Sequence, residues 1–253
     1  MRLILDPGSS HGNDWAKFQE LVKLCEECHA ELKFQLFTQS PGNLPCNRNL
    51  FTLAAKLGQS RGVPVFASVW DKEAIELVPL IGCRTIKIAY SQRNNEDLVN
   101  YATKMGVEVM VSYDWMDTPR PDVTALFCLP TYPVHYIVDF DGVFKRFVGF
   151  SDHTLGISQT TRAFTAGAQI IEKHVIPENP YECPDTKFAI TPSQARKLYE
   201  YISSGDGKNG TPLFQYPQQA GPENQTSGPR VGADAGHTGS GPRRVGDPHL
   251  DSL

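Results

Sequence analysis

Short apolar runs alternate with helical patterns along most of this chain, and this alternation limits the possible folds more than any other feature. Eight runs rich in β-forming residues begin about two dozen residues apart. Alternating β and α elements indicate a parallel sheet with helical connections. Eight such units predict an α/β chain folded as a compact, closed (β/α)8 TIM barrel over residues 1–204. The eight runs are residues 2–5, 32–37, 63–67, 85–89, 107–112, 125–129, 147–150 and 168–174.

Helical patterns fill most of the intervals between these runs. Gly62 is suited to end a helix, and Thr191 followed by Pro192 is suited to begin one. A doubly wound open sheet is the structural alternative, but no Gly-x-Gly-x-x-Gly follows the first run, which disfavours it. Residues 113–123 have little room for a helix, and residues 130–146 have room for a short one. The expected helices are residues 14–30, 50–62, 71–81, 95–105, 158–166 and 191–203.

Composition changes at about residue 205, where glycine, proline and polar residues become dominant. Such a segment cannot bury enough apolar surface to offset the entropy lost on ordering. We therefore expect residues 205–253 to be a disordered tail.

The remaining composition excludes several functional classes. The net charge is −4, with acidic and basic residues mixed along the chain, which is unlike a nucleic-acid-binding protein. No apolar stretch approaches the length of a membrane span, and no signal peptide is recognisable. The six scattered cysteines are then expected to be reduced thiols. These features predict a cytoplasmic protein that binds neither nucleic acid nor membranes.

The candidate site residues follow from the predicted barrel. Functional residues of a parallel barrel lie at the carboxyl ends of the strands and in the loops after them. This rule selects polar residues from six of the eight runs. They include Asp6, His11, Lys33, Gln35, Ser68, Lys87, Ser151, Asp152, His153, Glu172 and His174.

Lys33 and Lys87 are unusual because each lies within an apolar strand, where an ammonium group is costly to bury without a partner. One interpretation is a structural ion pair, with Glu31 or Asp6 as the partner of a lysine. The other is a phosphate clamp in which both lysines converge on one anion. His11, in the loop after the first run, is either a functional group or an ordinary polar loop residue.

His153 and His174 follow consecutive strands, and both are flanked by charged residues. Each histidine alone would be read as a core residue, but two of them favour a shared divalent metal ion with open coordination positions. Asp152 and Glu172 would then be outer groups that orient the imidazoles. Their alternative interpretation is solvated charge at the strand ends.

Two sequence segments closely resemble the paired signature of the N-acetylneuraminate (sialic acid) synthases and their relatives. They are VGFSDHTLG at residues 148–156 and AGAQIIEKH at residues 166–174. The relatives include legionaminate and pseudaminate synthases and spore-coat polysaccharide proteins. The resemblance covers most of residues 2–203. Weaker matches occur in the family order, namely ILDPGSSHGND (4–14), ELKFQLF (31–37), TIKIAYS (85–91), CLPTYP (128–133) and CPDTKFAITP (183–192).

The resemblance implies a transferase that condenses phosphoenolpyruvate with an N-acylated amino sugar such as N-acetylmannosamine. The products are a sialic-acid-type 2-keto sugar acid and phosphate. His153 and His174 match the positions that bind Mn²⁺ or Mg²⁺, and Asp185 is expected as an outer group of that site. Asp6 replaces a family glutamate. The phosphate of phosphoenolpyruvate is expected on Lys33, Ser68, Lys87 and Ser151, and the catalytic group comprises Asp6, His11, Lys33 and Lys87.

The chain departs from the family pattern at several positions. Tyr90-Ser91-Gln92 replaces Ser-Gly-Glu after the fourth strand, and Pro130 occupies a position that is often a polar phosphate ligand. The polar tail is not expected to form the C-terminal antifreeze-like domain of typical synthases. Family members are usually homodimers, so a homodimer is the expected assembly. The exchanged domain that favours this dimer is, however, not expected in this chain. Two alternatives therefore stay open: a catalytically silent barrel that binds a sugar or a partner enzyme, and condensation of phosphoenolpyruvate with a phosphorylated sugar.

Overall fold

The computed structural model describes residues 1–37 and 42–205, and these residues form a closed barrel of parallel strands. The strands follow chain order around the ring, and β1 pairs with β8 to close it. This closure confirms the predicted barrel and excludes the open sheet. Except for Gly205, the expected tail lies outside the described residues. The strands are β1 (Arg2–Asp6), β2 (Glu31–Leu36), β3 (Val65–Val69), β4 (Thr85–Ile88), β5 (Glu108–Tyr113), β6 (Thr124–Cys128), β7 (Gly149–Asp152) and β8 (Ile170–His174).

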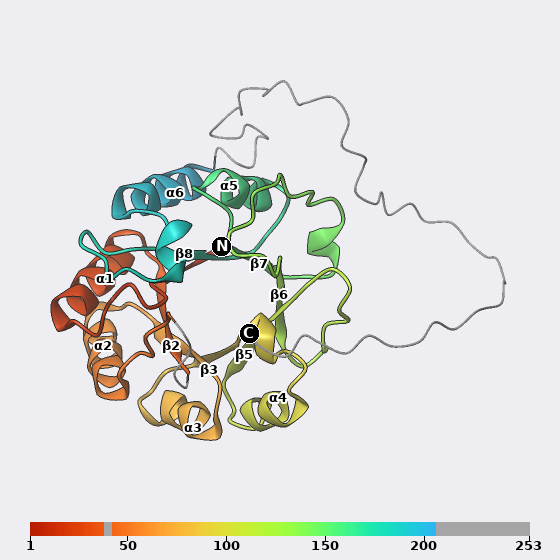
Figure 1. Cartoon of the computed structure of the whole chain (residues 1–253). Coiled ribbons are helices and arrows are strands. Elements are labelled where there is room, and N and C mark those ends of the chain that lie inside the picture. Colours follow the sequence, from red (N-terminus) through yellow and green to blue (C-terminus); the bar gives the residue numbers. More distant parts are fainter. Residues whose placement is uncertain (38–41, 206–253) are drawn as a thin grey trace, which may run out of the picture. The chain divides into compact units, whose positions relative to one another are not determined.

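The helices surround the ring of strands (Figure 1). Between β5 and β6 no helix is found in the described residues, and β6 and β7 are joined with only one short 3-10 turn, as the sequence predicts. The helix after β8 begins with the expected cap, in which the Thr191 and Gln194 side chains each accept a backbone N–H. The helices are α1 (Trp15–Glu27), α2 (Arg48–Arg61), α3 (Lys72–Leu80), α4 (Glu96–Thr103), α5 (Ser158–Thr165) and α6 (Pro192–Ser204), with 3-10 turns η1 (Tyr90–Gln92), η2 (Val143–Lys145) and η3 (Pro184–Lys187).

Three strands, β3, β7 and β8, begin two residues later than predicted, and the shifts have the same cause. The backbone N–H of Val63 donates to Gly58 O at 2.9 Å, which closes the end of α2. The backbone N–H of Phe147 donates to Val143 O at 3.0 Å, which closes η2. Before β8, the backbone N–H of Ala168 donates to Ala163 O at 3.0 Å, which closes the end of α5. These amides satisfy the preceding helix or turn, so they cannot begin the strand ladder.

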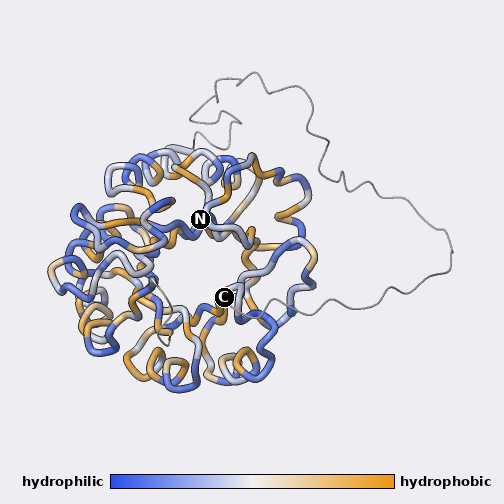
Figure 2. The backbone as a smooth tube through the Cα atoms, in the orientation of Figure 1, coloured by the Kyte–Doolittle hydropathy of each residue, from blue (hydrophilic) through white to orange (hydrophobic). Residues whose placement is uncertain are grey.

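The apolar core has two parts. A large layer lies between the strands and the helices. A small cluster fills the barrel interior on the side away from the carboxyl ends of the strands. Hydrophobic and hydrophilic residues alternate along the backbone tube (Figure 2), as expected where side chains point alternately into the barrel and toward the helices. Toward the carboxyl ends of the strands the interior is polar, and this polar layer forms the candidate site. The small cluster is Ile4, Phe66, Met110, Leu126 and Ile170.

A charged network closes the amino-terminal end of the barrel. The Arg2 guanidinium donates to Glu31 at 2.6 Å and to Glu108 at 2.8 Å. Glu31 therefore pairs with Arg2 at this end, and is not the partner of Lys33. Within the described ranges, no helix combines the length and apolar character needed to cross a membrane.

Candidate active site

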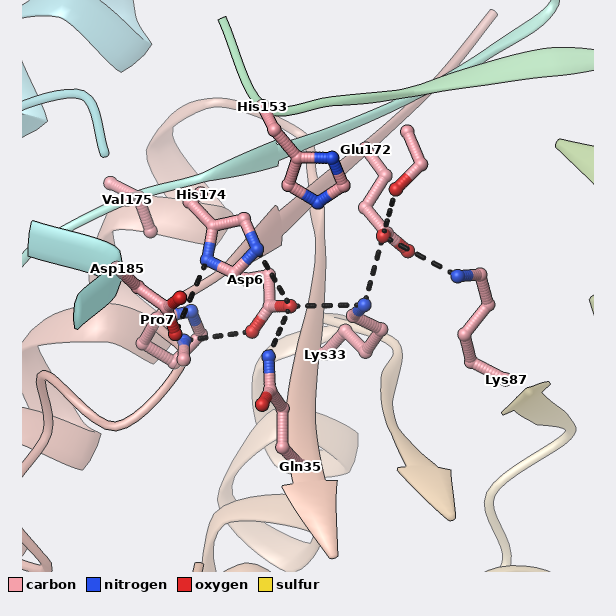
Figure 3. A network of polar contacts seen from close by, with 12 residues as sticks. Asp6, Pro7, Lys33, Gln35, Lys87, His153, Glu172, His174, Val175 and Asp185 are labelled. Carbon is pink, nitrogen blue, oxygen red and sulfur yellow. Dashed lines mark hydrogen bonds and ion pairs between the residues drawn. The ribbon is translucent and has the colours of Figure 1, made fainter. Parts of the chain in front are cut away.

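The carboxyl ends of the strands surround a cavity of about 400 Å³. The inward positions of β1, β2, β4, β7 and β8 bring residues that are far apart in sequence to this one mouth (Figure 3). All predicted site residues except His11 and Asp152 line the cavity. Those that do are Asp6, Lys33, Gln35, Ser68, Lys87, Ser151, His153, Glu172, His174 and Asp185.

Lys33 lies between two carboxylates inside the barrel. Its Nζ is 2.9 Å from Asp6 Oδ2 and 2.9 Å from Glu172 Oε1. Burial alone would lower the pKa of Lys33, but the two carboxylates raise it above its ordinary value. The ion pair that the sequence suggested with Asp6 is therefore present, with Glu172 as a second partner.

Glu172 is the point on which the donors of the cavity converge. Its Oε1 accepts a hydrogen bond from Ser151 Oγ at 2.7 Å and lies 3.5 Å from Lys87 Nζ, in addition to its contact with Lys33. Burial would raise the pKa of Glu172, but Lys33 and Lys87 hold it below its usual range. Only 2 % of Glu172 is exposed, so it is not a solvated strand-end charge. It pairs with the lysines, in place of the expected contact with an imidazole.

Lys87 has one ionic contact and one neutral partner. Its Nζ donates to Ser112 Oγ at 2.7 Å, and Glu172 is its nearest carboxylate. Burial lowers the pKa of Lys87, and Glu172 opposes this shift. Lys87 is therefore less strongly paired than Lys33, and its ammonium group is better placed to accept a further anion.

His153 and His174 face each other with ring centroids 5.4 Å apart. His174 Nε2 is 3.6 Å from Asp6 Oδ2, and His174 Nδ1 is 3.9 Å from Asp185 Oδ2. Burial, with a smaller contribution from His174, places the pKa of His153 well below its ordinary value. His153 is therefore neutral, which is the form of imidazole that binds metal ions.

The two imidazoles fit a divalent ion that takes part of its coordination shell from elsewhere. One nitrogen of each ring would hold the ion, and the ring separation of 5.4 Å between centroids is short enough for both rings to share it. His174 Nδ1 is buried and has no hydrogen-bond partner in residues 1–37 and 42–205. No cluster of three or more histidine, cysteine or acidic residues in these ranges is arranged to hold a metal. The remaining positions would therefore be filled by water or substrate oxygens.

Asp152 lies on the opposite face of β7, away from the cavity. Its carboxylate accepts hydrogen bonds from Lys173 Nζ at 3.1 Å and from Thr160 Oγ1, and contacts neither imidazole. Alternation along the strand explains this, because Ser151 and His153 point inward and the residue between them points outward. The expected direct contact with an imidazole is replaced by a buried ion pair, which also excludes a solvated charge.

His11 is packed between the barrel and α1, outside the cavity. Its ring lies 4.8 Å from the Phe18 ring and 5.8 Å from the Phe34 ring, measured between centroids. Its Nδ1 accepts the backbone N–H of Asn13 at 3.0 Å. Burial lowers the pKa of His11 to about 4, so the ring is neutral. His11 is thus a loop residue, as the sequence suggested, but it is buried in the core and does not line the cavity.

Gln35, which the strand-end rule also selects, lines the cavity, and its Nε2 donates to Asp6 Oδ2 at 2.9 Å. Other cavity residues were missing from the sequence-based set. Lys87 Nζ donates to Ser112 Oγ at 2.7 Å, and Ser112 is a polar residue of β5, so the strand-end rule could have selected it. Tyr132 packs against His153 at 4.3 Å between ring centroids. It comes from a long loop, and no local pattern predicts that contact.

Comparison with known proteins shows which family matches this chain. The NeuB family model matches residues 8–211. Pseudaminic acid synthase from Campylobacter jejuni is 27 % identical over 175 residues, which cover 59 % of this chain and 51 % of that protein. Human N-acetylneuraminate-9-phosphate synthase is 19 % identical, covering 84 % of this chain and 72 % of that protein. The chain spans about half the length of the pseudaminic acid synthases that it matches.

Two solved structures share the barrel fold of this chain. A sialic acid synthetase from Leptospira borgpetersenii superposes with a TM-score of 0.69 at 21 % identity, covering 86 % of this chain and 87 % of that chain. A spore coat polysaccharide biosynthesis protein from Bacillus subtilis gives 0.68 at 19 % identity, covering 83 % and 69 %. The family match extends over most of the barrel and includes both histidine-containing strands. The chain belongs to the NeuB family.

Proposed function

We propose that this barrel condenses phosphoenolpyruvate with the open-chain aldehyde of an N-acylated amino sugar, giving a sialic-acid-type 2-keto acid and phosphate. The enol carbon of phosphoenolpyruvate forms the new bond to the aldehyde carbon as the C=O π bond breaks, and the aldehyde oxygen takes a proton to become a hydroxyl. Water then adds to the resulting cation and loses a proton. The C–O bond to phosphate breaks as the keto group forms, and phosphate departs. The sugar acid synthases among the relatives motivate this choice of reaction class.

The observation that carries the proposal is the convergence of three donors on one buried oxygen. Lys33, Lys87 and Ser151 all approach Glu172 Oε1 within 3.5 Å. This arrangement resembles the environment that a phosphate oxygen requires, with two ammonium groups and a hydroxyl around one anionic atom. Ser68 Oγ also lines the cavity and is buried with no partner in the described part of the chain, so it is available to a ligand. A bound phosphate would accept the contacts that these donors now make with Glu172.

We infer that Asp6 would hold the water that adds to the cation. Gly8 N–H and Gln35 Nε2 both donate to its carboxylate, at 2.8 and 2.9 Å, which fixes the orientation of the group. Burial would raise the pKa of Asp6, but Lys33 and His174 lower it, so the carboxylate is ionised and can accept a proton from water.

We infer that His153 and His174 would hold a divalent ion, Mn²⁺ or Mg²⁺, beside the sugar aldehyde. Such an ion polarises a carbonyl oxygen as a Lewis acid. The chain itself positions both imidazoles: the Phe188 ring lies 5.7 Å from His153 and 5.0 Å from His174 between centroids, edge-on to each. These contacts restrict the rotation of both rings.

The reaction is tested by incubating the purified full chain with Mn²⁺, phosphoenolpyruvate and a panel of N-acylated amino sugars. We expect phosphate release that requires one of the sugars and yields an equal amount of 2-keto acid. Lys87→Met should lower kcat/KM by about 10²–10³-fold, the range for removing a group that stabilises developing charge. Lys23→Met is the matched control, because 67 % of the Lys23 side chain is exposed. Sugar binding without phosphate release from any sugar would contradict the proposal and favour a silent binding barrel.

A further inference from the structure

Behind the two imidazoles, on the outer face of β7 and β8, lies a buried polar cluster that the proposed reaction does not use. Lys173 lies between the inward residues Glu172 and His174, so its side chain points toward the helices. Lys173 is 0 % exposed. Asp152 is its neighbour in the strand register and holds its ammonium group at 3.1 Å.

The cluster holds the backbone on both sides of His153. Lys173 Nζ donates to the carbonyl oxygen of Thr154, and Asp152 Oδ1 accepts the backbone N–H of Thr154 at 2.7 Å. Thr160, at the start of α5, donates to the other oxygen of Asp152. The residues before and after His153 are therefore tied to one another and to a neighbouring helix.

A buried ion pair is a poor source of stability, because desolvation can exceed the attraction between the charges. Apolar residues of similar size would fill the same space at comparable stability. The hydrogen bonds of a charged pair are more directional than apolar contacts. Here they hold the backbone segment that carries the His153 imidazole in one orientation. Groups that orient a metal-binding histidine affect a site strongly even without contacting the ion.

We propose that Lys173, Asp152 and Thr160 form a clamp that positions His153 toward His174, so that Lys173 and Asp152 are positioning residues of the site. The clamp acts through the backbone of residues 152–154, because no member of it touches the cavity. Its connection to metal binding rests on the proposed function, but the orientation of His153 does not.

The test compares the full-length wild-type chain with the double variant Asp152→Asn/Lys173→Met. This pair removes both buried charges together, so neither is left unpaired, while the donor to Thr154 O is lost. Histidine-selective ¹³C/¹⁵N labelling and NMR report the ring of His153, assigned with His153→Gln. We expect one sharp set of His153 signals in the wild type and broadened or split signals in the double variant.

Arg2→Met is the matched control, because it breaks a charged network at the opposite end of the barrel. It should lower the unfolding midpoint and leave the His153 signals unchanged. If the double variant does not fold, Thr160→Val removes one donor to Asp152 and should still broaden the His153 signals. A folded clamp variant with a single, unshifted set of His153 signals would overturn the proposal.

Mn²⁺ titration followed by electron paramagnetic resonance gives a second readout. The double variant should bind Mn²⁺ about 10–100-fold more weakly than the wild type, with Arg2→Met equal to the wild type. Equal affinity in the double variant and the wild type would also overturn the clamp. If the wild type takes up no Mn²⁺, the proposed metal site fails, and the NMR comparison decides the clamp by itself.

Discussion

Replacing His11 by asparagine should remove a specific part of the acid sensitivity of this fold. His11 is fully buried between two phenylalanine rings, and burial lowers its pKa to about 4. In the unfolded chain its pKa would be about 6.5. Between these two values the unfolded chain binds a proton that the folded chain does not, so stability is present above pH 6.5 and is lost as the pH falls toward 4.

The size of the effect follows from the pKa shift. Each pH unit between the two pKa values costs about 1.4 kcal/mol of unfolding free energy. From pH 7 to pH 5 the His11 contribution should therefore fall by about 2 kcal/mol. The polar contact of the ring is with the backbone N–H of Asn13. In the described ranges the ring makes no ion pair, which would have stabilised its protonated form.

Urea unfolding at pH 5, 6 and 7, followed by tryptophan fluorescence, measures this loss. His11→Asn will be less stable at every pH because it leaves a void beside Phe18, but its free energy should fall by about 2 kcal/mol less than that of the wild type between pH 7 and 5. His135→Asn, at an exposed histidine, is the control and should keep the wild-type slope. Identical slopes for the wild type and His11→Asn would refute the assignment of a neutral, buried His11.

Three further changes test how the barrel is held together. Lys33→Met leaves the carboxylates that it pairs unneutralised and should lower the unfolding free energy by about 3–5 kcal/mol in urea titrations; a loss below 1 kcal/mol would contradict the buried pair. Gly149→Ala places a Cβ 2.3 Å from Ile170 O, a backbone atom that cannot move freely, and should cost about 1–3 kcal/mol, whereas an unchanged midpoint would be inconsistent with that approach. Thr191→Ala removes the cap of α6 and should cost about 1 kcal/mol, measured by thermal melting, with Thr191→Ser close to the wild type.

Most of the fold and of the cavity could be predicted because both depend on short-range periodicity. The spacing of β and α units indicates a parallel barrel, and the barrel brings strand ends together. The inward positions of Lys33, Lys87, Glu172 and His174 then follow from alternation along each strand. The pairing of His153 with His174 follows from their positions at the ends of consecutive strands, and the family resemblance agrees with it.

The sequence misplaced two site residues, Asp152 and His11. The position of the first depends on which face of the strand its side chain occupies, and that of the second on contacts distant in sequence. Asp152 was selected as a strand-end charge, although alternation with Ser151 and His153 places it on the outer face. The same alternation would have identified Lys173 as its partner. His11 could not be placed from sequence, because the loop that carries it folds back onto Phe18 and Phe34, and this packing is tertiary.

A crystal structure of the full chain with phosphoenolpyruvate and Mn²⁺ would show whether the two ammonium groups and the two imidazoles serve one cavity. We expect the phosphate within hydrogen-bonding distance of Lys33 and Lys87, with Glu172 displaced from at least one of them. Anomalous scattering should place the ion between His153 and His174. Phosphate bound elsewhere, or an ion that contacts neither imidazole at saturating Mn²⁺, would contradict the account.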